Sequence, residues 1–243
     1  MTQRTLLLTG ASRGIGHATV KVFQAAGWRV LTVSRTAFDP RCPWHAGATD
    51  HFEGDLSDNA SRTMLVAAVR KTLPDGCLHA VVNNAGISPK GSDGARIGVA
   101  DTDEALWLKV LSVNLLGPAG LMRDLLPELE RGQGSVVNVG SIVGTRVHPY
   151  AGAAYACSKA ALAALSREAA AELGPRGIRV NMVTPGEIET AILSDGARAM
   201  AGAIPLRRLG TPEEVARVVL FLCSGEASYV NGASIDVNGG QHA

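Results

Sequence analysis

The chain has 243 residues, a length that suits one α/β domain, and its 23 basic and 22 acidic side chains give a formal net charge of +1. This even balance argues against the concentrated basic surface with which proteins bind nucleic acids. A hydrophobic share of 46% and a charged share of 19% disfavour a disordered chain and predict a packed core.

The cysteines and the N-terminus indicate the compartment. The four cysteines, at positions 42, 77, 157 and 223, lie far apart and form no Cys-x-x-Cys pair. We therefore expect reduced thiols, with neither a disulfide framework nor a metal site, and we expect Cys157 to be buried packing. The first apolar run is three leucines long, and no apolar stretch approaches about 18 residues. These patterns predict a soluble, cytoplasmic protein without a membrane span.

Short apolar runs alternate with segments of helical length along the chain. The first run, at 5–9, precedes a glycine-rich turn, a helical pattern up to residue 26 and a second run at 29–33. Further runs lie at 78–82, 135–139, 178–183 and 233–237, and helical segments lie at 59–73, 101–130, 153–173 and 212–223. The alternation predicts a doubly wound, mostly parallel, Rossmann-like α/β sheet in a single domain spanning 1–243.

Three segments depart from this alternation. Between Arg35 and Asp55, two prolines and no helical period predict a loop that leads to a short strand near 51–53, with the crossover helix reduced or absent. Glycines and a proline interrupt weak helix signals at 187–210, which predicts a substrate flap. The polar, glycine-rich stretch 87–101 is expected to border the substrate cleft and to be partly mobile.

The glycine-rich turn between the first strand and the first helix reads Thr9-Gly-Ala-Ser-Arg-Gly-Ile-Gly16. Its glycines allow a tight turn, close approach of the backbone to a pyrophosphate and close helix packing. The start of a helix presents free N–H groups and partial positive charge to such an anion. The turn therefore predicts a dinucleotide site.

The end of the second strand bears on which dinucleotide binds. The strand ends with Ser34 and Arg35, and no carboxylate follows before Asp39. An acidic residue there binds the ribose 2′-hydroxyl of NAD, whereas arginines bind the 2′-phosphate of NADP. With Arg13 in the turn beside Arg35, we predict NADP(H), and NAD(H) is the alternative. The other interpretation is that both arginines are solvated surface charges.

Tyr155 and Lys159 are four residues apart in a helical segment and so lie on one face. A phenol has a pKa near 10, and a neighbouring cation lowers it toward the range useful for general acid/base catalysis. Taken alone, such a pair is usually an ordinary helix surface.

Six motifs in this order resemble the short-chain dehydrogenase/reductase family, in its compact single-domain branch, across essentially the whole chain. They are the Thr9–Gly16 turn, Asn83-Asn84-Ala85-Gly86, Asn114 in a long helix, Ser141 after the fifth strand, Tyr155-x-x-x-Lys159 and Pro185-Gly186-x-Ile188-x-Thr190. The chain is also similar to 3-oxoacyl-thioester reductases at 205–214. That stretch occurs widely in the family and does not discriminate among substrates.

The resemblance implies a role for each catalytic residue. Tyr155 would be the general acid/base, and Lys159 would lower its pKa and bind the nicotinamide ribose. Ser141 would hydrogen-bond the substrate oxygen, and Asn114 would hold a water that links Lys159 to solvent. From the residues alone, Asn114 could equally cap or kink its helix, and Ser141 could be a turn residue.

The resemblance and the turn together imply the cofactor site. Asp55 and Leu56 would contact adenine, and Ile188 and Thr190 would contact the nicotinamide carboxamide. The full set of expected cofactor-binding residues is Gly10, Ser12, Arg13, Gly14, Ile15, Gly16, Ser34, Arg35, Asp55, Leu56, Asn83, Ala85, Gly86, Tyr155, Lys159, Pro185, Gly186, Ile188 and Thr190.

Two further residues keep alternative interpretations. His148 is expected in a pocket wall or at the surface rather than as a second base, and Glu187 either contacts substrate or is a solvated flap residue. Alanines on several faces of 160–173, together with the family resemblance, predict a homotetramer.

The function predicted from these features is an NADP(H)-dependent oxidoreductase that interconverts a carbonyl and a secondary alcohol of a small molecule. The alternatives are a non-catalytic dinucleotide-binding regulator and an NAD-preferring dehydrogenase of a sugar or cyclitol. An epimerase or dehydratase is disfavoured because the length leaves no space for an added substrate domain.

Overall fold

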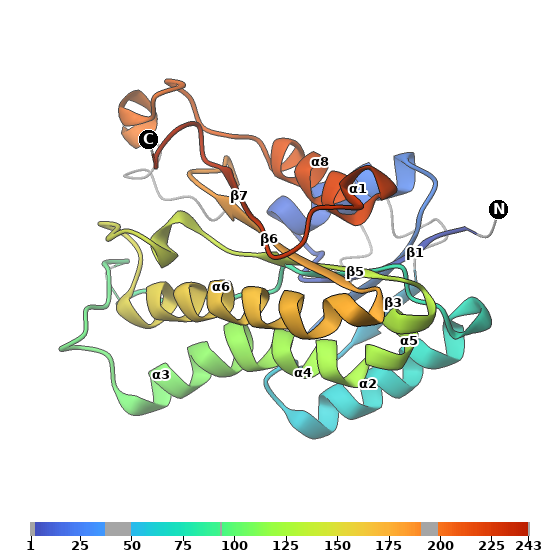
Figure 1. Cartoon of the computed structure of the whole chain (residues 1–243). Helices are drawn as coiled ribbons and strands as arrows, with labels where there is room; N and C mark the ends of the chain where they lie inside the picture. The colour runs from blue at the N-terminus through green and yellow to red at the C-terminus, as the bar shows by residue number, and fades with distance from the viewer. Residues whose placement is uncertain (1–2, 37–49, 93, 191–198, 243) are drawn as a thin grey trace.

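A computed structural model describes residues 3–36, 50–92, 94–190 and 199–242, and all structural statements below concern these residues. Seven parallel strands form one sheet in the order β3-β2-β1-β4-β5-β6-β7. The expected doubly wound α/β class is confirmed (Figure 1). The strands are β1 (Thr5–Thr9), β2 (Arg29–Ser34), β3 (Asp50–Glu53), β4 (Ala80–Asn83), β5 (Ser135–Val139), β6 (Arg179–Pro185) and β7 (Ser234–Val237).

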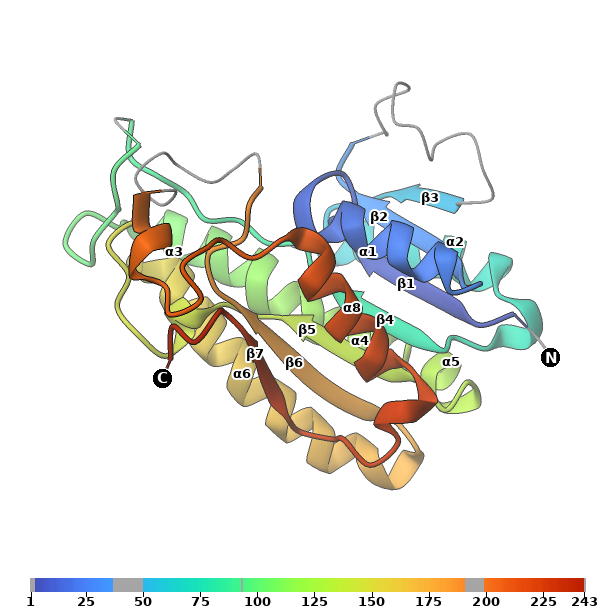
Figure 2. The same ribbon diagram turned by 90° about the horizontal axis from the view of Figure 1, so that it is seen from above.

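Helices cover both faces of the sheet. Helices α1 and α8 lie side by side on one face, and α2 to α6 cover the other (Figures 1 and 2). Their bounds are α1 (Gly14–Ala25), α2 (Asn59–Thr72), α3 (Glu104–Leu111), α4 (Gly117–Asp124), α5 (Leu126–Arg131), α6 (Ala153–Leu173) and α8 (Pro212–Cys223).

Strand β1 shows why its sequence is a continuous apolar run. Leu6 and Leu8 are fully buried in the core beneath α1 and α8, whereas Leu7 is fully buried in the core formed with α2, α4 and α6. Successive side chains of a strand point to opposite faces, so a strand with both faces covered needs apolar residues at every position. The register of the sheet follows from this double burial.

Side-chain caps fix several helix starts. Asp58 accepts a hydrogen bond from the Ser61 amide (2.7 Å) at the start of α2, and Asp103 accepts one from the Leu106 amide (2.7 Å) at the start of α3. Helix α8 begins with a capping box between Thr211 and Glu214. These contacts occupy amide groups that the helix itself leaves without partners.

The predicted long helix at 101–130 is a run of shorter elements. A π-helical turn, Ser112–Leu116, joins α3 to α4, and α5 follows after Leu125. The stretch Glu104–Asp124 has a mean hydropathy of 1.4 over its most apolar window, so by length and composition it could span a membrane. Because the run packs against α2 and α6, and 39% of that window is buried, we interpret it as part of the helical layer on the sheet rather than as a membrane span. The expectation that no segment reaches that length is corrected here.

The remaining sequence expectations compare as follows. The bounds of α6, α8, β1 and β5 are as predicted, and those of the other strands differ by one or two residues. Strand β3 is present near 51–53, but residues 37–49 of the preceding loop lie outside the described part, as do residues 191–198 of the expected flap. Cys157 is exposed on α6, so its expected burial is wrong. It stands two positions from Tyr155, on the face of α6 turned away from the core.

Candidate active site

The glycine turn is closed so tightly that two of its positions accept only glycine. A Cβ on Gly16 would lie 2.1 Å from the Gly10 carbonyl oxygen, and a Cβ on Gly10 would lie 2.8 Å from Cα of Ala85. Gly10 also has a φ of +70°, which favours glycine. Asn84 holds the turn through hydrogen bonds from its side-chain amide to the carbonyls of Thr9 (3.1 Å) and Gly10 (2.8 Å).

The start of α1 is open toward this turn. Its N-cap residue, Arg13, is extended and makes no side-chain cap, and the first helical turn carries no acidic residue. Free N–H groups at such a helix start favour a bound phosphate. A Cβ on Gly14 would lie 3.2 Å from the Thr190 side chain, so the segment after β6 returns to the glycine turn. These features fit a dinucleotide pyrophosphate.

The expected adenosine side lies at the ends of β2 and β3. Arg13 and Arg35 are both exposed. The pKa of Asp55 is lowered mainly by hydrogen bonding with Ser57, and the charge of Arg35 lowers it further. Ser34 pairs with Glu53 in the β2–β3 register. The pairing places Glu53 next to the end of β2, where the sequence itself has no carboxylate. Sequence alone did not show this, because residues paired across strands are not neighbours in the chain.

The expected catalytic groups gather at the carboxyl ends of the strands. Tyr155 is partly buried, and burial raises the pKa of its phenol while hydrogen bonding with Ser141 opposes this rise. The Lys159 ammonium lies 5.7 Å from the centre of the Tyr155 ring and donates to the Val139 carbonyl (2.7 Å). Burial lowers the pKa of Lys159 to about 8.

The electrostatics of Tyr155 differ from the sequence expectation. We expected a neighbouring ammonium to lower the pKa of the phenol, but the folded protein raises it. Desolvation disfavours the charged phenolate, and the Lys159 ammonium points to a backbone carbonyl rather than to the phenol oxygen. The phenol is therefore held in its protonated form.

Asn114 lies in the π-helical turn and is almost completely buried. Its side chain accepts from the Ile87 amide (2.8 Å) and donates to the Ile87 carbonyl (3.0 Å) and to Ser158 Oγ (3.0 Å). A Cβ on Gly86 would lie 3.4 Å from Asn114 Oδ1 and 3.5 Å from Lys159 Nζ. A π turn contains one extra backbone residue, which changes the direction of a side chain. Here Asn114 connects Ile87 to Ser158 of α6 and lies next to Gly86.

Several other expected residues are placed by the same geometry. Ile188 is buried and bridges to Gly210, whereas Asn83 is buried and donates to Asn138 Oδ1 (2.8 Å) in the sheet interior. The Asn83 side chain is therefore used within the core. Ile97, in the stretch 87–101, contacts the start of α6, where the Ala153 amide donates to the Ile97 carbonyl (3.0 Å).

The family described as enoyl-(acyl carrier protein) reductase matches residues 10–242. Over 98% of this chain and 87% of its own length, Protein FixR of Bradyrhizobium diazoefficiens is 54% identical. An oxidoreductase of the short-chain dehydrogenase/reductase family from Brucella ovis, solved with a partially ordered NAD, is 51% identical with a TM-score of 0.85, over 98% of this chain and all of that one. The chain belongs to the short-chain dehydrogenase/reductase family.

A second solved relative is also an oxidoreductase with bound NAD. The 3-oxoacyl-[acyl-carrier protein] reductase of Brucella melitensis with bound NAD is 36% identical, with a TM-score of 0.89 over all of this chain and 92% of that one. Both of these relatives are oxidoreductases solved with NAD, and the glycine turn described above fits a nicotinamide dinucleotide.

One pair in this short-chain dehydrogenase/reductase was not recognised from sequence. His148 Nε2 lies 2.8 Å from Glu187 Oε1, and both side chains are at least nine-tenths buried. Glu187 is therefore not a solvated flap residue, and His148 lies in the wall beside it. The two are 39 positions apart, and no local pattern signals their contact. The prolyl-glycyl turn before Glu187 was the available hint.

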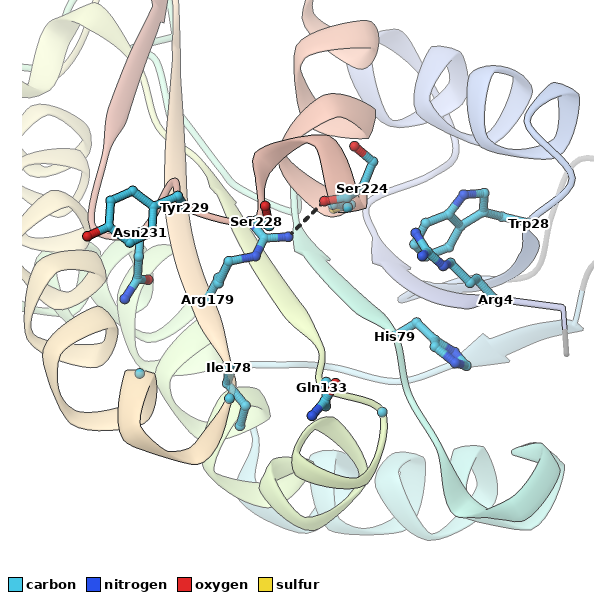
Figure 3. A pocket seen from close by; sticks show the side chains of 15 residues that line it. Arg4, Trp28, His79, Gln133, Ile178, Arg179, Ser224, Ser228, Tyr229 and Asn231 are labelled. Atoms are coloured by element: carbon cyan, nitrogen blue, oxygen red, sulfur yellow. Dashed lines mark hydrogen bonds between the residues drawn. The ribbon is translucent and has the colours of Figure 1, made fainter. Parts of the chain in front are cut away.

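A cavity of about 790 Å³ lies away from this site. It is lined by Arg4 before β1, His79 before β4 and Arg179 at the start of β6 (Figure 3). These are the amino ends of the strands, whereas Ser141 follows the carboxyl end of β5. Parallel α/β sheets bind ligands outside the carboxyl ends. The Arg179 guanidinium donates to the Leu222 and Ser224 carbonyls (2.8 and 3.1 Å), a structural use.

Proposed function

We propose that the protein is an oxidoreductase that interconverts a carbonyl and a secondary alcohol of a small molecule, with a nicotinamide dinucleotide as hydride carrier. The observation that carries this proposal is the convergence of Ser141, Tyr155 and Lys159 at the same strand ends as the glycine turn. A surface Tyr/Lys pair would be solvated, whereas burial shifts the pKa values of both residues here.

The cofactor residues of the sequence analysis, apart from the side chain of Asn83, are proposed to hold the dinucleotide, with the pyrophosphate at the start of α1 and the nicotinamide beside Ile188 and Thr190. When bound, the nicotinamide supplies or accepts a hydride at its C4 position. The tight approach of Gly10 to Ala85 and of Gly14 to Thr190 supports this placement. A Cβ has no room at Gly10, and at Gly14 it would crowd the Thr190 side chain.

Tyr155 is proposed to transfer the proton. Because burial raises its pKa, the phenol is protonated and can donate to the oxygen of a carbonyl as that oxygen gains negative charge. Ser141 hydrogen-bonds the same oxygen. Lys159 is proposed to bind the nicotinamide ribose, and Asn114 to hold a water that links Lys159 to solvent as a proton path.

Replacing Tyr155 with Phe tests the reaction. Loss of the general acid/base should lower kcat by about 10²-fold or more while cofactor binding stays within about threefold. Consumption of reduced cofactor at 340 nm with a ketone panel measures kcat, and fluorescence titration measures binding. The fully exposed Tyr229, replaced by Phe, is the matched control. Unchanged turnover in Tyr155→Phe would refute the mechanism, and a wild-type protein that binds cofactor without turnover would favour the regulator alternative.

We propose NADP(H) as the preferred cofactor because Arg13 and Arg35 are both exposed at the ends of the turn and of β2. Guanidinium groups bind a 2′-phosphate by charge-assisted hydrogen bonds. The second candidate is NAD(H), favoured by the NAD in two solved relatives and by the Ser34–Glu53 register. The double variant Arg13→Gln, Arg35→Gln should lower kcat/KM for NADPH by about tenfold or more and leave that for NADH nearly unchanged. A wild-type preference for NADH would refute NADP(H).

We further propose a cytoplasmic homotetramer. Leu108 and Leu116 on the α3–α4 run and Phe221 on α8 are exposed apolar side chains on two separate surfaces. Two self-complementary surfaces on one protomer generate dihedral tetramers. Light scattering at micromolar concentration should give four times the protomer mass, and a monomeric mass would refute the assembly.

A further inference from the structure

The contact between His148 and Glu187 lies beside the proposed proton donor. His148 comes from the loop that precedes α6, and Glu187 follows β6. The Glu187 charge raises the pKa of Tyr155, though less than burial does, and it also acts on the ammonium of Lys90. The carboxylate is therefore within electrostatic reach of the phenol.

The backbone fixes Glu187 in this place. The Glu187 backbone amide donates to the Gln241 side chain (3.1 Å), and the Glu187 carbonyl accepts from the Gly210 amide (2.9 Å). Two residues further on, the Glu189 amide donates to the Gly210 carbonyl (2.8 Å). Such pinning from two other segments is what a precisely placed polar group needs.

The tautomer of His148 follows from its other ring nitrogen. Nδ1 accepts a hydrogen bond from the Tyr150 amide (3.3 Å), so the neutral ring carries its hydrogen on Nε2, which faces Glu187. Although Nε2 is 2.8 Å from Oε1, it is not aligned as a hydrogen bond and has no other partner among the described residues. His148 Nε2 therefore retains hydrogen-bonding capacity that the described residues do not use.

A carboxylate in this position has the wrong sign to stabilise the negative charge that grows on a carbonyl oxygen during reduction. It is suited instead to accept hydrogen bonds from a neutral donor and to repel an anion. We propose that Glu187, oriented by His148, determines specificity by binding a hydroxyl group next to the reacting carbon of a neutral hydroxyketone or vicinal diol. This inference rests on the proposed function.

Two matched substrate pairs test the proposal, each with the preferred cofactor. Wild type should reduce 2-hydroxycyclohexanone with a kcat/KM about tenfold or more above that for cyclohexanone, because a hydrogen bond to a charged acceptor is strong. It should also prefer ethyl acetoacetate over acetoacetate, which carries a negative charge. Glu187→Gln should lower the first ratio at least threefold and shift the second at least threefold toward the anion.

Glu226→Gln is the matched control, because it removes the same charge from an exposed position outside the site, and it should leave both ratios unchanged. His148→Gln is the second variant should Glu187→Gln fail to fold, and it should lower the first ratio. Ratios unchanged in both site variants, with ketone reduction intact and lost in Tyr155→Phe, would overturn this inference alone. Absence of turnover with any of these ketones and either cofactor would overturn the proposed function and this inference with it.

Discussion

Replacing Lys159 with Met tests whether the buried charge of Lys159 lowers the free energy of unfolding. The ammonium is 4% exposed, and its pKa falls from 10.5 to about 8 through burial. Between these pH values the lysine of the unfolded chain holds a proton that the folded protein has released. The unfolded state then binds more protons, so the free energy of unfolding rises with pH across this window.

The size of this rise follows from the two pKa values. The difference between 10.5 and about 8, at about 1.36 kcal/mol for each pH unit, is about 3 kcal/mol. Below pH 8 the folded protein carries the full cost of the buried charge. Met removes that cost but leaves the Val139 carbonyl without its donor, which costs about 1–3 kcal/mol. The stability of Lys159→Met relative to wild type should therefore fall by about 3 kcal/mol between pH 7.5 and pH 10.5.

Urea unfolding followed by circular dichroism at several pH values measures this change. Cys223 also titrates differently in the two states, because burial raises the pKa of its thiol to about 12. That term opposes the lysine term above pH 9, but both proteins share it, so the difference between them isolates Lys159. Lys109→Met, which removes an exposed lysine, is the matched control and should show a flat difference. A flat difference for Lys159→Met as well would refute the reasoning.

Three further variants test the turn, the core and a helix cap. Gly16→Ala should abolish measurable dinucleotide binding in a fluorescence titration, because its Cβ would lie 2.1 Å from the Gly10 carbonyl oxygen; binding within threefold of wild type would contradict this geometry. Phe23→Ala should lower the free energy of unfolding by about 3–5 kcal/mol in urea, since the ring is fully buried. A loss below about 1 kcal/mol would contradict this prediction and show that the neighbouring side chains fill the space left by the ring. Thr211→Ala should cost about 1 kcal/mol through loss of the α8 cap and leave kcat unchanged, so a changed kcat would reveal a role beyond the cap.

Local patterns predicted most of the fold because each element has a local cause. The bounds of α8 follow from the Thr-Pro-Glu-Glu start, whose capping box forms as such a sequence indicates. The π-helical turn at Ser112–Leu116 was not predicted. It inserts one residue into a helix whose periodicity looks regular, and it is stabilised by contacts of Asn114 with Ile87 and Ser158, which lie far away in the chain.

The site was predicted unevenly for the same reason. Tyr155 and Lys159 share a helix, so their spacing predicted that they are neighbours. The direction of the Tyr155 pKa was wrong, because spacing does not show how much water the fold removes or that Lys159 turns to the Val139 carbonyl. The contact of His148 with Glu187 joins two loops, and only the folded chain brings these loops together.

Burial shifts the pKa values of Tyr155 and Lys159 in opposite directions. Burial holds Tyr155 protonated and makes Lys159 easier to deprotonate, so at a pH near 8 the lysine, not the tyrosine, is poised to exchange a proton with solvent. A tyrosine that gives its proton to substrate must be reprotonated before the next turnover. Gly86 lies against Lys159 Nζ, and Asn114 holds the residue that follows it. In the proposed mechanism the proton is supplied through Lys159, so kcat for reduction should fall as pH rises through about 8.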